Sequence, residues 1–309
     1  MTGLVPRPRP RKPAGLTDPT AVDAAVSALA SGGVVAHGFA NFYALATAPD
    51  LAAVQRMNLL KGRPAGQTGS ITLPPARLPG VFDWTRMPDG AHRDRVLAVA
   101  DLLFALGPIG LRGPAAAHVP EHLTAAENGV RTVQVIGPGY ACPSHRFLAH
   151  ALARTGHAFL AITSANRSRR QTGAAEEPAH WQASHLRAEF DGEPALTFLE
   201  HHDEPAARRR FPHHQPMSTT VVAFRNTTAH QGRLIVERQG SLPLDLVERT
   251  AAQAGFAVVL ADRAATPLRQ RSYHTRQPHP PDTAMRGNVH DRDTSRQTRS
   301  ASESSDERR

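Results

Sequence analysis

Two short polar clusters carry the side-chain types that bind a polyphosphate. Lys61 and Arg63 place two cations on either side of Gly62, where a bound group can approach the backbone closely. Ser164 and Asn166 follow an apolar run, and short polar side chains at the end of a strand hold ligands in open α/β sheets. Arginine can bridge two phosphate oxygens, whereas lysine acts as a point charge. Together the two clusters predict a phosphate-binding site.

Each cluster also has a purely structural interpretation. Lys61 and Arg63 follow an expected helix over residues 49–60, and cations at a helix C-terminus interact favourably with the helix dipole. Ser164 and Asn166 are residue types that commonly cap the start of a helix. A functional interpretation therefore needs support from the rest of the chain.

The elements that must position these clusters form a mixed α/β pattern. Apolar periodicity and capping residues predict helices over residues 17–30, 49–60, 92–106 and 143–156. Apolar or alternating runs predict strands over residues 34–36, 42–46, 70–73, 132–136, 159–162, 219–224 and 233–236. No internal repeat is visible, so we expect one twisted mixed sheet with helices packed on it.

The charge of the chain is concentrated at its two ends. Residues 1–15 contribute +4 and residues 262–309 contribute +3 of the formal net charge of +9, which leaves +2 for the rest. So small a charge does not favour a nucleic-acid-binding core. We expect a folded domain over residues 16–255, with a basic disordered tail over residues 1–15 and a charged disordered tail over residues 256–309, because these ends are poor in apolar side chains.

The two clusters and their surroundings resemble the YrdC-like family, whose signature is a KxR pair followed by SxN. The stretch GGVVAHGFANFYALATAPDLAAVQRMNLLKGRP is similar to the family's opening strand, its PTDTVYGL loop and its helix into KGRP. AITSANRS is similar to TSANxS, and Leu106-Gly107-Pro108 stands where the family has PGP. Residues 218–222 resemble a STVVD strand, and residues 236–240 resemble a closing RxG. These matches occur in colinear order over residues 16–242.

The resemblance implies an α/β sheet around a positively lined central cavity and the activity of L-threonylcarbamoyladenylate synthase. That enzyme, a nucleotidyltransferase, joins ATP, bicarbonate and L-threonine and releases pyrophosphate, for the threonylcarbamoyladenosine modification of tRNA. Lys61 and Arg63 would be catalytic, and ATP would be bound by Lys61, Arg63, Thr163, Ser164, Asn166 and Arg238. Magnesium would be carried with the nucleotide. Such chemistry relies on holding reactants together and neutralising charge on phosphate oxygens.

The amino-acid side of the expected site departs from the family pattern. Phe39, Ala40 and Asn41 stand where the family loop has Thr-Asp-Thr, while Thr72 and Ile136 stand where it has histidine and arginine. Replacing arginine by isoleucine removes a bidentate carboxylate partner. The resemblance nevertheless implies a substrate pocket that includes Asn41, Tyr43, Thr72, Thr219 and Thr220.

These departures leave three functions open. The protein could make the usual intermediate with compensating residues, act on another carbamoyl or amino-acid substrate, or bind nucleotide or RNA without turnover. Joint retention of the KxR and SxN clusters argues against complete decay. We keep tRNA or double-stranded RNA as a candidate partner of the basic protein, and its binding should depend strongly on salt.

Other sites and locations are not favoured by the sequence. The single cysteine, Cys142, cannot form an internal disulfide and indicates a structural thiol. The pairs His201-His202 and His213-His214 would point to opposite faces of a strand, so we expect no metal site made by the protein. Without a signal peptide or a long apolar run, the chain is predicted to be cytoplasmic, with no membrane segment.

Overall fold

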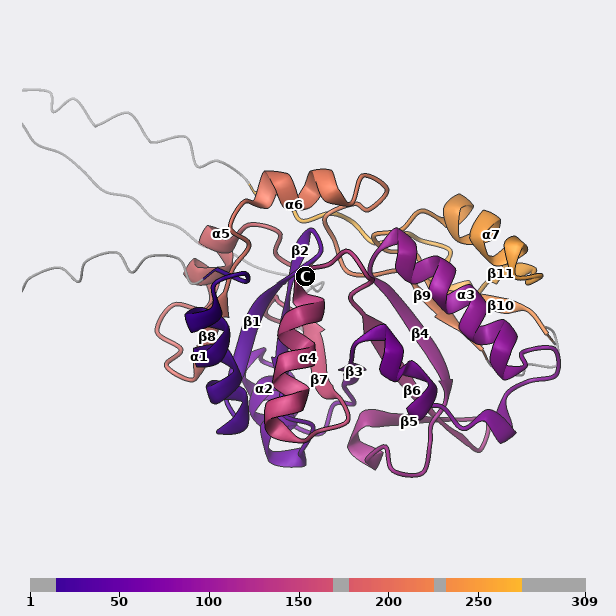
Figure 1. The fold of residues 1–309 in the computed structure, drawn as a ribbon, viewed down its shortest axis with the longest axis horizontal. Helices are drawn as coiled ribbons and strands as arrows, with labels where there is room; N and C mark the ends of the chain where they lie inside the picture. The colour runs from indigo at the N-terminus through magenta and orange to yellow at the C-terminus, as the bar shows by residue number, and fades with distance from the viewer. Residues whose placement is uncertain (1–14, 169–177, 225–231, 274–309) are drawn as a thin grey trace, which may run out of the picture. The chain divides into compact units, whose positions relative to one another are not determined.

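The computed structural model describes residues 15–168, 178–224 and 232–273 of the 309-residue chain (Figure 1). The expected tail over residues 1–15 lies almost wholly outside these residues, as does the chain beyond residue 273. A compact unit ends at Ser272, so the folded domain continues past residue 255, where we placed its end. The added part includes a short strand that pairs in the sheet.

One mixed sheet organises the described residues. Its strands lie in the order β11-β10-β9-β4-β6-β3-β7-β2-β1-β8, and β5 pairs with β6 beside this path. The strands are β1 Val34–Phe39, β2 Phe42–Thr47, β3 Ser70–Thr72, β4 Ile109–Pro114, β5 Thr124–Glu127, β6 Val130–Gly137, β7 Leu160–Ser164, β8 Leu196–Leu199, β9 Val221–Ala223, β10 Leu234–Arg238 and β11 Val258–Leu260. Parallel and antiparallel neighbours both occur, which confirms the predicted mixed α/β class.

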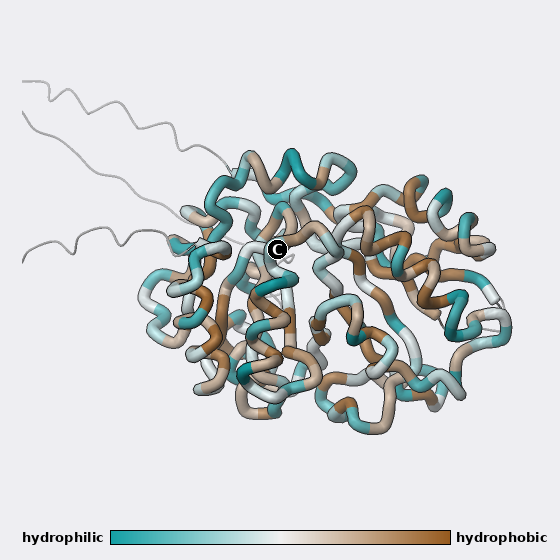
Figure 2. The backbone as a smooth tube through the Cα atoms, in the orientation of Figure 1, coloured by the Kyte–Doolittle hydropathy of each residue, from teal (hydrophilic) through white to brown (hydrophobic). Residues whose placement is uncertain are grey.

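Helices pack along the sheet, and four of them form two pairs. The helices are α1 Pro19–Ala30, α2 Leu51–Leu60, α3 Arg93–Leu106, α4 Ser144–Thr155, α5 Ala183–Glu189, α6 Glu204–Arg210 and α7 Leu244–Gln253. Figure 1 shows α1 beside α4 near β1, and α3 beside α7 near β4 and β10. The brown, apolar segments in Figure 2 follow the strands and the helices that pack on them.

Local sequence signals explain where the first elements begin and end. The carboxylates of Asp18 and Asp50 accept hydrogen bonds from backbone N–H groups in the first turns of α1 and α2, as N-caps do. Helix α2 ends at Lys61, and Gly62 then adopts φ +70°, a left-handed conformation that suits glycine. The chain therefore turns sharply at the first cluster.

Several elements were not predicted from the sequence. These are strands β4, β5, β8 and β11 and helices α5, α6 and α7; β5, β8, β11, α5 and α6 have at most seven residues each, whereas the amphipathic helix α7 was missed although its pattern is clear. The strand expected over residues 34–36 continues to Phe39, so only a two-residue turn at Ala40 and Asn41 separates β1 from β2. Among the described residues, no helix has the length and apolar character needed to cross a membrane.

Candidate functional site

The two clusters predicted from the sequence meet at the end of β7. Lys61 is fully buried, and its ammonium donates to Thr163 Oγ1 at 3.3 Å and Asn166 Oδ1 at 3.2 Å, and also to the Ser164 carbonyl. Ser164 Oγ donates to the same Asn166 oxygen at 2.6 Å. A buried ammonium needs such acceptors, because burying an unpaired charge is costly. Lys61 thus holds the hydroxyl of Thr163 and the amide of Asn166 in place.

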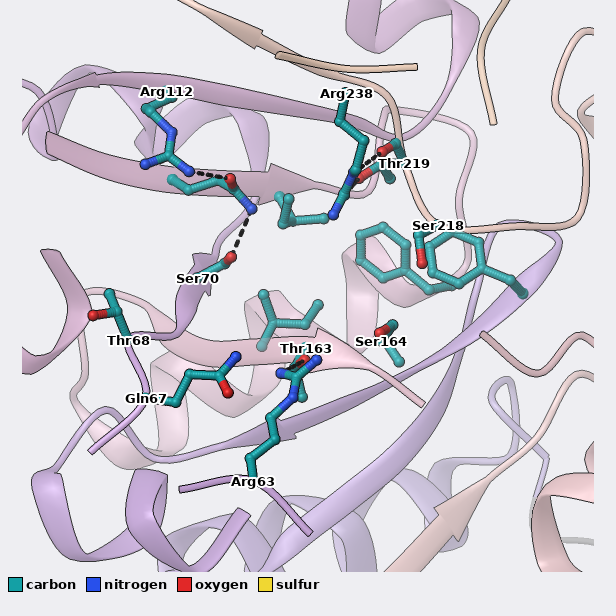
Figure 3. Close-up of a pocket in the computed structure, with 16 residues that line it drawn as sticks. Arg63, Gln67, Thr68, Ser70, Arg112, Thr163, Ser164, Ser218, Thr219 and Arg238 are labelled. Carbon is teal, nitrogen blue, oxygen red and sulfur yellow. Dashed lines mark hydrogen bonds between the residues drawn. The ribbon is translucent and has the colours of Figure 1, made fainter. Parts of the chain in front are cut away.

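Two arginines line the cavity beside this cluster. Arg63 donates to Thr163 Oγ1 at 2.8 Å, and Arg238 donates to the Thr219 carbonyl at 2.9 Å and to Thr219 Oγ1 at 3.2 Å. Figure 3 shows the two guanidinium groups entering the cavity from opposite sides. A register shift between Val236 and Arg238 interrupts the β9–β10 ladder, and bulges of this kind redirect a side chain.

The cavity has two chambers that share one wall. The first chamber has a volume of about 340 Å³ and the second about 410 Å³. Arg63, Ser164, Ser218 and Arg238 line both chambers. Because the shared wall carries both guanidinium groups and two hydroxyls, an anionic group is favoured at the junction.

The second chamber is lined in part by a segment from beyond the expected domain end. Residues 266–269 line it, opposite Asn166, Pro178 and Ala179. The Leu268 N–H donates to the Gln239 carbonyl at 2.9 Å, which attaches the segment to the end of β10. Arg271 donates to the Pro178 carbonyl and the Glu189 carboxylate. The chain past residue 255 therefore completes the site.

The first chamber has a polar end and an apolar wall. Arg112, on β4, donates to Gln134 Oε1 at 2.7 Å, and Gln134 donates to Ser70 Oγ at 2.8 Å (Figure 3). The guanidinium of Arg112 also lies 3.2 Å from Glu127 and 2.9 Å from the buried Glu237. Phe39, Phe42, Ala44, Ile136 and Ile162 also line this chamber and form its apolar wall.

The structure brings together most, but not all, of the expected site residues. Arg63, Thr163, Ser164, Thr219 and Arg238 line the first chamber, and Asn166 lines the second. Lys61 lies directly behind them. The ATP-binding set expected from the sequence is thus spatially contiguous.

Four residues expected in the substrate pocket do not line either chamber. Asn41 donates to the His214 carbonyl at 2.6 Å, and Thr72 donates to the Ile136 carbonyl at 2.7 Å. Tyr43 donates to Glu204 at 2.9 Å, and burial raises the pKa of its hydroxyl. Thr220 donates to the Leu242 carbonyl at 2.6 Å. Turn geometry and strand register direct these side chains into the fold instead.

Six polar residues of the first chamber were not among the site residues predicted from the sequence. They are Gln67, Thr68, Ser70, Arg112, Gln134 and Ser218. Arg112 and Gln134 face each other across paired strands, and only the register of β4 on β6 makes this visible. A strand prediction at residues 109–114 would have been the signal to look for.

Cys142 and the paired histidines lie outside the two chambers. Cys142 is buried, burial raises the pKa of its thiol, and its sulfur accepts the Ala40 N–H at 3.1 Å, so it has a structural position. Burial lowers the pKa of His201 and of His214 to about 4. Across residues 15–168, 178–224 and 232–273, no group of three or more His, Cys, Asp or Glu side chains is arranged to hold a metal ion.

Comparisons with known proteins place the fold. No protein-family model and no curated protein matches the sequence. Sua5 of P. abyssi complexed with L-threonine aligns with a TM-score of 0.56 and 22% identity, over 83% of this chain and 65% of that chain. A double-alanine variant of that Sua5 aligns with a TM-score of 0.56 and 20% identity, over 81% and 63%. The chain therefore spans slightly less than two thirds of these Sua5 chains.

A shorter protein gives a third comparison. A hypothetical protein of Streptococcus mutans UA159 aligns with a TM-score of 0.53 and 13% identity, over 77% of this chain and 94% of that chain. Identities this low show a shared fold, and function must be argued from the site. The resemblance seen in the sequence is thus confirmed at the level of structure: the described residues have the YrdC-like fold.

Proposed function

We propose that this protein binds ATP across the two chambers and uses it to adenylate a small amino-acid-derived acceptor, as L-threonylcarbamoyladenylate synthase does. One observation carries the proposal. The guanidinium groups of Arg63 and Arg238 enter the junction of the chambers from opposite sides, and Ser164 and Ser218 line the same junction. Opposed bidentate donors of this kind suit a polyphosphate chain.

The second chamber suits the adenosine of the nucleotide. Its lining includes the apolar side chains of Pro178, Ala179, Pro267 and Leu268, against which a base can pack. Asn166 lies on the same lining and offers its amide to the sugar or base. With adenosine there, the phosphates reach the shared wall.

The first chamber would then receive the acceptor. The Sua5 structure that shares this fold contains L-threonine, which supports an amino acid as the small substrate. Bicarbonate and the amino group would form a carbamate with loss of water. A carbamate oxygen would then bond to the α-phosphorus while the bond from that phosphorus to the bridging oxygen breaks and pyrophosphate leaves.

The residues of the junction would act mainly through charge and position. Arg63 and Arg238 would neutralise the charge that develops on the phosphate oxygens and on the leaving pyrophosphate. Lys61 is engaged with Thr163, Ser164 and Asn166, so its part would be to hold those groups in place. Neither step requires a protein nucleophile.

Magnesium would arrive with the nucleotide. The lining of the two chambers, within the described part of the chain, contains hydroxyl, amide and guanidinium groups but no carboxylate. Magnesium is commonly held by substrate phosphates together with few protein ligands. The hydroxyls of Ser164 and Ser218 lie on the wall that the two chambers share with Arg63 and Arg238, where they could contact the metal.

Calorimetry with ATP and magnesium tests the nucleotide site. We expect Arg63→Ala and Arg238→Ala each to weaken ATP binding about tenfold or more, because hydrogen bonds to charged groups contribute about 1.5–3 kcal/mol. Arg249→Ala is the matched control, since Arg249 is exposed on α7 and pairs with Asp245. Equal affinity in all four proteins would remove the site assignment.

Pyrophosphate release then separates an enzyme from a binding protein. The assay contains ATP, magnesium, bicarbonate and each amino acid in turn. Release that depends on one amino acid supports adenylation of an acceptor. ATP binding without release under any condition would instead favour a nucleotide- or RNA-binding protein, for which binding of tRNA and double-stranded RNA at two salt concentrations is the next measurement.

A further inference from the structure

The apolar wall of the first chamber is a separate cluster rather than an edge of the main core. Phe39, Phe42, Ala44, Ile136, Ile162, Ala179 and Val221 form this cluster, and Trp181 packs against it. Phe39 and Phe42 lie with ring centroids 5.5 Å apart, where β1 turns into β2. Five members line the first chamber, and Ile136, at 8% exposed, is the most accessible of them, so the apolar surface open to a ligand is mainly that of Ile136.

The position of Ile136 in this wall is fixed by its neighbours. Ile136 pairs with Gly110 on β4, and a Cβ atom at Gly110 would lie 3.0 Å from Ile136 Cδ1 and 2.7 Å from Val221 Cγ2. The glycine therefore leaves room for the isoleucine side chain against the strand. Because paired strands hold it, Ile136 presents a constant apolar surface.

The polar groups that could have covered this wall are directed elsewhere. The Thr72 hydroxyl donates to the Ile136 carbonyl, and the Asn41 amide donates to the His214 carbonyl. Ala40, between Phe39 and Asn41, has a methyl group as its side chain. If the substrate carried a hydroxyl group against this wall, that hydroxyl would lose its hydrogen bonds to water. Thr72, Asn41 and Ala40 would not replace those bonds.

We propose that the first chamber selects an acceptor amino acid with a branched aliphatic side chain, such as valine or isoleucine, over threonine. Ile136 determines this selection, and the fully buried Phe39 packs behind it in the same cluster. The inference rests on the proposed function for the amino-acid class of the acceptor. The charged end of the acceptor lies toward Arg63 and Arg238, and its side chain packs on the apolar wall.

Valine and threonine make the sharpest pair of probes because they have nearly the same shape. A hydrophobic pocket rejects a hydroxylated isostere by at most about a hundredfold. A pocket built to hydrogen-bond the hydroxyl discriminates in the opposite direction, and more strongly. Tighter binding of valine therefore indicates an apolar wall, and tighter binding of threonine indicates a wall that hydrogen-bonds the hydroxyl.

The experiment measures amino-acid binding directly, without requiring turnover. L-valine, L-isoleucine and L-threonine are titrated by calorimetry into the full chain with bicarbonate, both with and without ATP and magnesium. We expect valine and isoleucine to bind about 10- to 100-fold more tightly than threonine. Ile136→Thr should reduce this preference, whereas Ile71→Val, in the main core away from the chamber, should keep it.

The outcomes separate this inference from the proposed function. Threonine binding as tightly as valine, or no binding of any of the three amino acids, would overturn the selection. Loss of the ATP signal alone would overturn the nucleotide site, while a valine preference would still support the apolar wall. Thermal unfolding of both variants shows whether each is folded, and Phe39→Leu, which keeps the wall apolar, should retain the preference.

Discussion

The two sides of the cavity differ in how their side chains are held. On the nucleotide side, Lys61 is surrounded by hydrogen-bond acceptors, and Arg63 and Arg238 are each anchored to a threonine. On the acceptor side, Phe39 and Ile136 are held by packing alone. Hydrogen bonds specify direction, whereas packing specifies shape. We infer that the polar side accepts few substitutions, while the apolar side can change its substrate.

The buried ammonium of Lys61 gives the strongest test of this contrast. Lys61→Met keeps the apolar stem but leaves the acceptors on Thr163, Ser164 and Asn166 without their shared donor. We expect the free energy of unfolding to fall by about 4 kcal/mol, because three hydrogen bonds from a charged donor are lost and each contributes about 1.5–3 kcal/mol. Denaturant unfolding measures this loss, and a fall below about 1 kcal/mol would contradict the role given to the ammonium.

Acid tests the polar contacts that support the second chamber. Burial raises the pKa of Glu189, but the hydrogen bonds from His180 and the Arg167 N–H, with the charge of Arg271, outweigh this and hold it at about 2. Because the folded-state pKa lies below the ordinary value of 4.5, its contribution is present above about pH 4.5 and is lost as pH falls toward 2.

The size of this acid effect follows from the pKa shift. The free energy of unfolding should fall by about 3 kcal/mol more in the wild type than in Glu189→Gln between about pH 5 and pH 2. Denaturant unfolding across this range measures both proteins. Parallel curves would show that the Glu189 carboxylate adds no acid-sensitive stability.

A pair of isoleucine variants tests whether the apolar wall really borders a cavity. Ile71 is fully buried in the main core, whereas Ile136 faces the first chamber. Ile71→Ala should lower the free energy of unfolding by about 3 kcal/mol, and Ile136→Ala by only about 1 kcal/mol, since part of its surface already lacks packed neighbours. Equal losses would mean that the wall belongs to the close-packed core.

The turn before the apolar wall should show the smallest effect. Ala40 has φ +54°, in the left-handed region where an alanine is strained. Ala40→Gly should raise the free energy of unfolding by about 1 kcal/mol. Ala36→Gly, within β1, is the control and should lower it by about 1 kcal/mol. A loss at both positions would show that the turn carries no strain.

The two sides of the cavity also differ in how well their residues could be predicted from the sequence. The clusters at Lys61 and Ser164 could be predicted because each is a short run of chemically distinctive residues at the end of a regular element. The positions at Phe39 and Ile136 were predicted to change the acceptor side, and both line the first chamber. Asn41 and Thr72 were placed in the same pocket from their sequence positions, but their side chains point into the fold.

The sequence by itself predicted the mixed α/β fold class and singled out the Lys61-Arg63 and Ser164-Asn166 clusters and the loop at residues 39–41, because these depend on residue type and local spacing. Only the tertiary structure shows that Arg112 contacts Gln134 and that residues 266–269 line the second chamber. It also shows that Lys61 is buried beneath Thr163 and Asn166. Strand register, a bulge and long-range hydrogen bonds set these directions, and none of them is encoded within one short segment of the chain.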